Sequence, residues 1–133
     1  MRDHAAIMIR EGEKFLFVQR SASKKTLPNI WAFPSGTIEE GEAAEVTTVR
    51  EAREELGVDV EVLKILDSVD LPEFGTRLVF VICGIKSGTP MIQAADEIQA
   101  LRWMSLEDFF REYTDEQIGH GLVYLRQHPE RWT

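Results

Sequence analysis

The sequence predicts an α/β fold in which helices pack on a mixed β-sheet. Two observations predict it: short apolar segments that suit strands recur along the chain, and they are interspersed with segments whose composition and capping residues favour helices. Strands and helices mixed in this order are typical of a sheet covered by helices. The 133 residues show no internal repeat, low-complexity tract or Pro/Ser-rich linker, so we expect a single domain over residues 1–133.

The first strands are expected near the start of the chain. The segments AAIMI (5–9) and KFLFVQR (14–20) are rich in apolar residues and are separated by the polar REGE, which predicts two strands joined by a tight turn. Residues 21–29 are polar and basic, as in a surface loop, and an apolar pattern resumes before Pro34. We expect an ordinary turn at Pro34 and Ser35.

The middle of the chain predicts one helix followed by three strands. Residues 43–56 are mostly good helix formers, and Gly57 is a natural left-handed stop. Residues 58–71 alternate well enough for a long strand, and residues 77–85 (RLVFVICGI) suit a fully buried strand. A further strand is expected over residues 98–105.

Two helices are expected at the end of the chain. Ser105 can cap a helix over residues 106–110 (LEDFF). Thr114 and Gln117, three residues apart, suit a capping box for a helix over residues 115–127. The two glycines inside that last segment weaken a helix by about 1 kcal/mol each relative to alanine.

Composition limits the classes of partner. The formal net charge of -8 argues against a general affinity for nucleic acid or for anionic membranes, both of which select basic faces. The single cysteine, Cys83, lies in an apolar run, which excludes a disulfide framework and favours a reducing setting. We find no signal peptide and no apolar stretch of membrane-spanning length, so we expect a cytoplasmic protein. The apolar strands could support a homodimer.

The expected helix at residues 43–56 carries an unusual concentration of acids. Glu51, Glu54 and Glu55 stand at positions i, i+3 and i+4 and therefore share one face. Like charges at this spacing destabilise a helix by a few tenths of a kcal/mol per pair. Arg50 lies four residues before Glu54 and can pair with it. Taken alone, this face suits a solvated helix surface as well as a cation site.

The residues upstream of these acids remove that ambiguity. Gly36 is followed after five residues by Glu42, and after seven more by the acidic stretch REAREELGV. This spacing resembles the complete signature of the Nudix hydrolases of the MutT type, G-x5-E-x7-R-E-U-x-E-E-x-G-U, from Gly36 to Val58. The resemblance continues upstream through residues 20–42, where Ser35 replaces the first of two glycines usual in the family. Glycine reaches positive φ at no steric cost, which suits Gly36 to a loop that approaches a ligand.

The resemblance implies a fold, a reaction and a cofactor. The fold is the Nudix fold, a mixed β-sheet sandwiched between α-helices. The reaction is hydrolysis of a nucleoside diphosphate linked to another moiety, with Mg²⁺ or Mn²⁺ and an attacking water. Hard cations of this kind take oxygen ligands, and bridging metals would offset the repulsion between an acidic protein and a diphosphate. The metal-binding residues implied are Gly36, Glu51, Glu54 and Glu55.

Other residues are assigned catalytic roles on the same resemblance. Glu54 is also a candidate for orienting or deprotonating the water, with Arg50 holding it in place. Glu42 would be an outer ligand or a partner of the inner ligands. A general base from a later strand is expected at Glu97, with Asp96 as the alternative.

The sequence identifies the substrate-binding residues less closely than the metal-binding ones. Aromatic faces stack on any base and cations meet phosphate oxygens, so we assign substrate binding to Arg20, Trp31 and Arg77. The same chemistry leaves further side chains open as alternatives: Lys24, Lys25, Phe33 and Phe74. His120 lies between two glycines and could approach the substrate, but we expect it to be structural. Pro72, fifteen residues after Gly57, resembles a proline of the members that hydrolyse ADP-ribose.

Three functions follow as hypotheses. The first is a pyrophosphohydrolase acting on a small nucleotide: a nucleoside triphosphate, an oxidised nucleotide or a nucleotide sugar such as ADP-ribose. The second is a catalytically silent ligand sensor or interaction module that keeps the fold without turnover. The third is an acidic, cation-binding structural domain. Dependence of catalysis on Glu54 separates the first from the other two.

Overall fold

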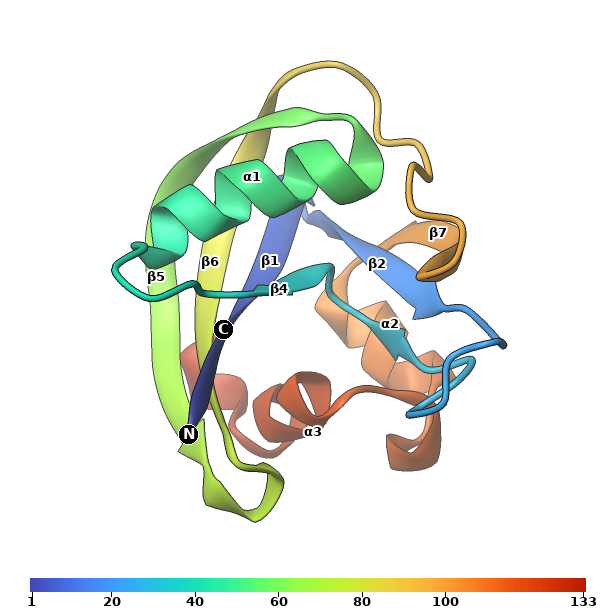
Figure 1. Cartoon of the computed structure of the whole chain (residues 1–133). Coiled ribbons are helices and arrows are strands. Elements are labelled where there is room, and N and C mark those ends of the chain that lie inside the picture. Colours follow the sequence, from blue (N-terminus) through green and yellow to red (C-terminus); the bar gives the residue numbers. More distant parts are fainter.

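Seven strands form one mixed sheet with helices on both of its faces in the computed structural model, which describes all of residues 1–133 (Figure 1). The strands are β1 (Arg2–Glu11), β2 (Lys14–Arg20), β3 (Trp31–Ala32), β4 (Ser35–Thr37), β5 (Asp59–Leu71), β6 (Thr76–Ser87) and β7 (Ile98–Met104). The helices are α1 (Ala44–Leu56), α2 (Leu106–Glu112) and α3 (His120–Gln127), with short 3-10 turns η1 (Pro72–Phe74), η2 (Asp115–Gln117) and η3 (Pro129–Arg131). No helix combines the length and the apolar composition needed to cross a membrane.

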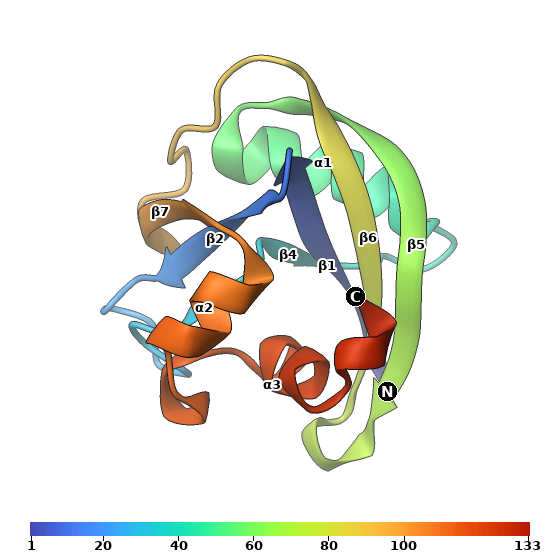
Figure 2. The same ribbon diagram turned by 180° about the vertical axis from the view of Figure 1, so that it is seen from behind.

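The sheet separates two apolar cores, because alternate residues of a strand point to opposite faces. On β1, Ile7 and Ile9 pack with Ala52 and Leu56 of α1. Other residues of β1, such as Met8, face the core that contains side chains of α2 and α3 (Figure 2). The expected fold, a mixed sheet sandwiched between helices, is confirmed.

The strand order leaves an opening beside β1. The order is β3-β2-β1-β6-β5, and only β1 and β6 run parallel. One edge of β1 pairs with β6 along residues 2–10. The other edge is shared: β4 pairs with residues 4–6, and β2 pairs only with Arg10 and Glu11 near the turn. Strands β1 and β2 therefore diverge from their common turn, which leaves space for a cleft between them.

Strand β4 was not predicted from the sequence, and neither was the two-residue strand β3. Ser35 lies opposite Ala6 in the pairing of β4 with β1, so the ordinary turn expected at this residue is wrong. Three small residues carry no strand signal of their own. Their conformation comes from β1, whose free edge offers unpaired backbone groups to any extended segment nearby. All the strands that were expected are present. The helix α1 also ends as expected, because Gly57 has a left-handed φ of 63°.

The helix expected over residues 115–127 is wrong in extent. The capping box of Thr114 and Gln117 forms, yet it closes only η2. The chain is extended at Ile118, and α3 begins at His120. The interruption comes from the sheet, because the N–H of Gly119 donates to the carbonyl of Trp31 at 3.0 Å. Ser105 caps α2 as expected, accepting from the N–H of Asp108 at 3.1 Å.

Gly121 has a packing role in α3. A Cβ at this position would lie 3.0 Å from Cδ1 of Leu78 and 3.4 Å from the ring of Phe80. The missing side chain lets the start of α3 lie against β6, which outweighs the low helix propensity of glycine.

Gly121→Val should destabilise the fold by about 1–3 kcal/mol, since it forces extra carbons into a packed contact. Urea denaturation would measure the loss. Gln127→Val, on the exposed side of the same helix, is the control and should cost about 0.5 kcal/mol or less. Equal losses in the two variants would contradict the packing role.

Candidate functional site

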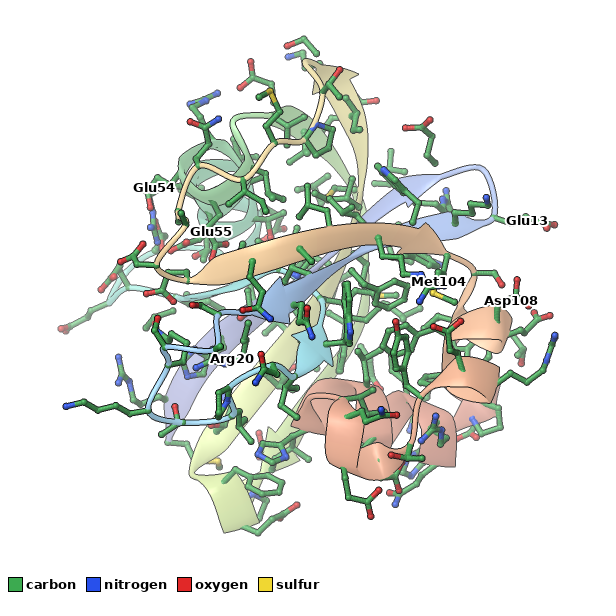
Figure 3. All side chains as sticks on the ribbon, turned by 90° about the vertical axis from the view of Figure 1, so that its right-hand side faces the viewer. Glu13, Arg20, Glu54, Glu55, Met104 and Asp108 are labelled. Atoms are coloured by element: carbon green, nitrogen blue, oxygen red, sulfur yellow. The ribbon has the colours of Figure 1, made fainter.

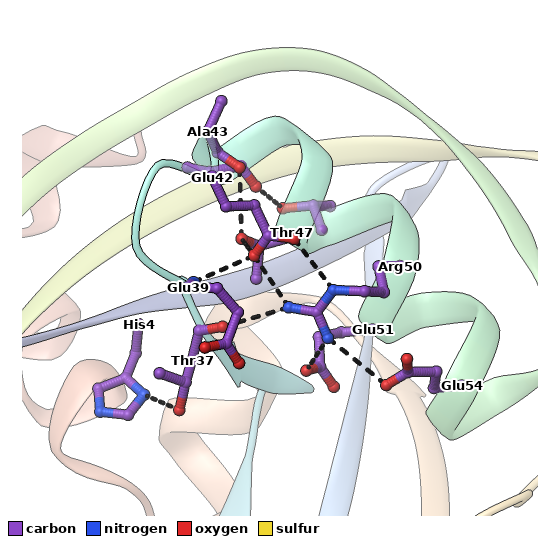
Figure 4. A network of polar contacts seen from close by, with 11 residues as sticks. His4, Thr37, Glu39, Glu42, Ala43, Thr47, Arg50, Glu51 and Glu54 are labelled. Carbon is purple, nitrogen blue, oxygen red and sulfur yellow. Dashed lines mark hydrogen bonds and ion pairs between the residues drawn. The ribbon is translucent and has the colours of Figure 1, made fainter.

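The guanidinium of Arg50 connects the acidic residues around α1. It donates to Glu42 through both Nε and Nη2, at 3.0 and 2.9 Å. It also donates through Nη1 to Glu51 at 2.9 Å, and the expected ion pair with Glu54 is present at 3.5 Å (Figure 4). The carbonyl of Thr37 in β4 accepts from Nη2 at 3.3 Å. Arg50 thus fixes α1 relative to β4 and to the loop between them.

Glu42 is the main partner of Arg50. Thr47 donates to its Oε1 at 2.6 Å, and the N–H of Glu39 donates to the same oxygen at 3.1 Å. The bonds from Arg50, then those from Thr47 and Glu39, lower the pKa of Glu42 to about 2. Glu42 therefore stays ionised and holds Arg50, which in turn contacts Glu51 and Glu54.

Gly36 lies directly under the side chain of Glu51. A Cβ on Gly36 would lie 2.2 Å from Cγ of Glu51 and 2.6 Å from its Oε1. The glycines with positive φ are Gly12, Gly41, Gly57, Gly75 and Gly88. Gly36 is not among them, so its freedom to adopt a positive φ is not used here. Glycine is required because the Glu51 side chain occupies the space of any Cβ.

Glu55 is the one acid of α1 with a buried oxygen that has no hydrogen-bond partner, its Oε2. Burial, followed by the charges of Glu51, Glu97 and Glu54, raises the pKa of Glu55 to about 8. Burial likewise raises the pKa of Glu51, partly offset by Arg50. A buried carboxyl group surrounded by other acids is unfavourable unless a proton or a cation joins it.

A cleft of about 190 Å³ opens between the diverging strands, and Glu55 lies in its wall. More than half of the lining residues are apolar, and they come from all strands except β4, from the segments after β2 and β3, and from η1 and α3. The charged side chains in the lining are Arg20, Glu55 and Glu97, with His120 as the one histidine. Glu54, Glu55 and Arg20 lie on the same side of the molecule (Figure 3). The cleft therefore combines an acidic group with a largely apolar chamber.

Glu97 reaches this cleft through the loop between β6 and β7. The N–H groups of Met91 and Gln93 donate to the carbonyls of Leu56 and Glu55, each at 2.9 Å, so the loop is bonded to the end of α1. Lys24 pairs with Oε2 of Glu97 at 2.7 Å. The structure thus brings Glu97 beside Glu55, whereas its neighbour Asp96 is exposed and does not line the cleft.

The expected substrate-binding residues lie in different places. Arg20 lines the cleft, and its guanidinium donates to the carbonyls of Leu27 and Thr26, at 3.1 and 2.9 Å. Those bonds hold the backbone around Leu27, which has a positive φ of 49°. Trp31 packs near Tyr113, with ring centroids 5.8 Å apart, and does not line the cleft.

Arg77 faces away from the cleft. Its neighbours Thr76 and Leu78 line the cleft, and alternation along a strand points Arg77 to the other side. Arg77 pairs there with Asp70 of β5 at 2.7 Å. The sequence around Arg77 did not indicate which face of the sheet its side chain would occupy.

Of the three histidines, His120 is the one that lines the cleft. Its ring stacks on Phe74, with centroids 3.5 Å apart and planes within 10°, and both side chains line the cleft. Sequence analysis expected His120 to be structural. The pair of glycines beside it had left open a close approach to the substrate, and the structure places the ring in the cleft lining.

No group of three or more His, Cys, Asp or Glu side chains is close enough to hold a metal ion in the present arrangement. Arg50 contacts both Glu51 and Glu54, so these carboxylates now share a protein cation. The site has the donors that a hard cation would use, and Arg50 pairs with two of them, Glu51 and Glu54.

Comparison with known proteins gives consistent results. A family model described as the NUDIX domain matches residues 1–126. Nudix hydrolase 5 of Arabidopsis thaliana is 29% identical over 96% of this chain and 46% of its own length. An isopentenyl-diphosphate Delta-isomerase of Cereibacter sphaeroides is 30% identical over 95% of this chain and 77% of its own length. The MutT NUDIX hydrolase structure from Burkholderia pseudomallei has a TM-score of 0.70, 23% identity, and coverage of 99% and 98% of the two chains.

These matches carry different weight. The chain spans less than half the length of the plant relative, and the structural likeness shows the fold. The family model covers nearly the whole chain, and it includes the stretch from Gly36 to Val58 that carries the acids around Arg50. The chain therefore belongs to the NUDIX domain family.

Proposed function

We propose that the chain is a metal-dependent pyrophosphohydrolase that cleaves a nucleoside diphosphate linked to another moiety. The observation that carries this proposal is the buried, unpartnered oxygen of Glu55, which lies among acids at the wall of a cleft. Burying an acid without a partner lowers the stability of the fold, so stability does not explain its presence. Acids with strongly shifted pKa values in clefts are typical of functional sites.

The residues present fit a divalent metal ion. Glu51, Glu54 and Glu55 offer carboxylate oxygens from one turn of α1, and Gly36 would add its backbone carbonyl. Mg²⁺ or Mn²⁺ bound there would neutralise the phosphates and lower the pKa of a bound water. A cation would also offset the unfavourable free energy of burying the Glu55 carboxylate.

The remaining residues would position the reactants. Arg50 fixes the rotamers of Glu51 and Glu54, and Glu42 fixes Arg50 in turn. Glu97 lines the same cleft and is the candidate general base, with Lys24 holding its carboxylate. Phosphoryl transfer depends mostly on such positioning and on charge neutralisation.

The substrate we propose is a nucleoside triphosphate, an oxidised nucleotide or a nucleotide sugar resembling ADP-ribose. The cleft would take the part of the substrate beyond the diphosphate. The competing hypotheses are a catalytically silent sensor and an acidic structural domain. Both predict that no substrate is turned over.

The first experiment measures phosphate products from nucleoside triphosphates, ADP-ribose, nucleotide sugars and isopentenyl diphosphate, with and without Mg²⁺. We expect one nucleotide class to be cleaved only with metal. Glu54→Gln should lower kcat at least 100-fold with little loss of stability, since it relieves repulsion between acids. Glu45→Gln, on an exposed position of the same helix, is the control. Wild-type turnover in Glu54→Gln would contradict the proposed site.

Gly36→Ala tests the contact between Gly36 and Glu51. The added methyl group would displace the Glu51 side chain, so we expect kcat to fall at least tenfold and half-saturation to need more Mg²⁺. Kinetics at varied Mg²⁺ measure both effects. Glu40→Ala, in the exposed loop before α1, is the control. Unchanged Mg²⁺ dependence in Gly36→Ala would show that Glu51 does not act on the metal.

Glu55 should make the metal-free protein sensitive to pH. Its pKa is about 8 in the folded protein and 4.5 ordinarily, so between these values the folded chain keeps a proton that the unfolded chain has lost. The free energy of unfolding is therefore highest below pH 4.5 and falls as the pH rises toward about 8, the pKa of Glu55 in the folded protein. The fall is about 1.4 kcal/mol per pKa unit.

Thermal melts of metal-free protein at about pH 5 and about pH 8 measure this effect; each kcal/mol corresponds to roughly 3 °C in Tm. Glu55→Gln should flatten the fall, and Mg²⁺ should raise the Tm of the wild type at the higher pH. Glu45→Gln should keep the wild-type slope. Parallel slopes for wild type and Glu55→Gln would contradict the assignment.

A further inference from the structure

Residues 21–30 link β2 to β3 and lie at one side of the cleft; we call this segment the strap. Leu27 and Ile30 of the strap line the cleft, as does Arg20 at the end of β2, where the strap begins (Figure 3). The side chain of Leu27 is 40% exposed although it lines the cleft, so it lies where the cleft opens to solvent. The strap therefore forms part of the mouth of the cleft.

Hydrogen bonds hold the two ends of the strap. At its base, the N–H of Asn29 donates to the carbonyl of Arg20 at 3.1 Å, and the N–H of Arg20 donates to the carbonyl of Ile30 at 2.9 Å. The side chain of Gln99 in β7 accepts from the N–H of Ala22 and donates to Oδ1 of Asn29, each at 2.8 Å. These bonds fix both ends of the strap to the sheet.

The tip of the strap, residues 25–28, depends on the side chain of Arg20. The guanidinium donates through Nε to the carbonyl of Leu27 at 3.1 Å and through Nη2 to the carbonyl of Thr26 at 2.9 Å. The hydroxyl of Thr26 accepts a longer bond from Nη2 at 3.4 Å. No hydrogen bond to the tip comes from any other residue, so one side chain supplies them all.

The backbone of Leu27 has a conformation that needs this support. Its φ of 49° lies in the left-handed region, which is unfavourable for a bulky side chain. The side chain is too exposed for packing alone to hold the residue in that conformation. The bonds from Arg20 therefore stabilise a conformation that leucine by itself disfavours.

Arg20 is the one Lys or Arg in the cleft lining, and the sequence analysis assigned it to substrate binding. Its Nε and Nη2 form the edge of the guanidinium that would bind two phosphate oxygens. The carbonyls of Leu27 and Thr26 already occupy that edge. A phosphate bound there would displace both carbonyls and free the tip, whereas a metal ion at the acids of α1 would neutralise the phosphates and leave the strap in place.

We propose that Arg20 is a positioning residue that holds Leu27 at the mouth of the cleft, and that Leu27 there limits the size of the group beyond the substrate's diphosphate. Leu27 is then the residue that determines specificity, and Arg20 acts through it. The selectivity rests on the proposed function, whereas the support of the strap tip by Arg20 can be tested without turnover.

The first test measures trypsin cleavage of the metal-free protein at Lys24 and Lys25, with the fragments identified by mass spectrometry. Cleavage requires local opening of the strap, so its rate reports how well the tip is held. Arg20→Gln should raise the rate at these lysines by roughly tenfold or more relative to cleavage elsewhere in the chain. Arg10→Gln, at an exposed position of β1 outside the cleft lining, is the control and should leave the rate unchanged.

A rescue variant separates support of the strap from direct contact with the substrate. Asparagine adopts the left-handed region more readily than leucine does. Adding Leu27→Asn to Arg20→Gln should therefore restore part of the resistance to trypsin. An unchanged cleavage rate in Arg20→Gln, or no restoration by Leu27→Asn, would overturn the role of Arg20.

The second test compares the nucleotide that the wild type cleaves best with an analogue that carries an additional ring, such as NAD⁺ beside ADP-ribose. Leu27→Ala should raise kcat/KM for the larger compound roughly fivefold or more relative to the smaller one, mainly through KM. Arg20→Gln should produce the same change, and the double variant should add nothing, since both changes act through the position of Leu27. Leu63→Ala, an exposed leucine outside the cleft lining, is the control.

Other results would overturn the selectivity. If Arg20 binds a phosphate directly, Arg20→Gln lowers kcat/KM equally for both compounds, and its effect adds to that of Leu27→Ala. Unchanged selectivity in Leu27→Ala would remove the role of Leu27. The proposed function fails separately: absence of hydrolysis by the wild type removes the enzyme and the selectivity with it, while the trypsin rates still decide whether Arg20 holds the strap.

Discussion

The interaction on which the rest of the site depends is the one between Arg50 and Glu42. It is bidentate, and the same guanidinium reaches Glu51, Glu54 and the carbonyl of Thr37. Three segments meet there: the loop before α1, the helix itself and β4. The acids of α1 repel one another, and this arginine offsets part of that repulsion by pairing with Glu51 and Glu54.

The second constraint is the divergence of β1 and β2. Strand β1 pairs with β6 along one edge and divides its other edge between β4 and β2. The cleft occupies the space that this division leaves, with α1 contributing Glu55 and β6 contributing Leu78 to its wall. The site is therefore a consequence of strand pairing as much as of the acidic helix.

Local patterns predicted most of the fold, because hydrophobic periodicity and capping residues act within a few positions of the chain. The helix ending at Gly57 and the strand over residues 58–71 are examples. Strand β4 and the break at Ile118 were beyond local reasoning, since both form through contacts with distant strands. The same limit explains the site: spacing placed Glu51, Glu54 and Glu55 together, whereas the faces taken by Arg77, Trp31 and His120 depend on the folded sheet.

The loop between β6 and β7 couples two parts of the cleft that are far apart in the chain. It is bonded to the carbonyls of Glu55 and Leu56 before it delivers Glu97 to the cleft. The carbonyl of Glu97 also accepts from the N–H of Ser21 after β2 at 2.8 Å, so the loop is bonded to α1 at one end and to the segment after β2 at the other. The turn at residues 94–96 would therefore have to absorb any change in loop length, while the two bonded ends keep Glu97 in place relative to Glu55.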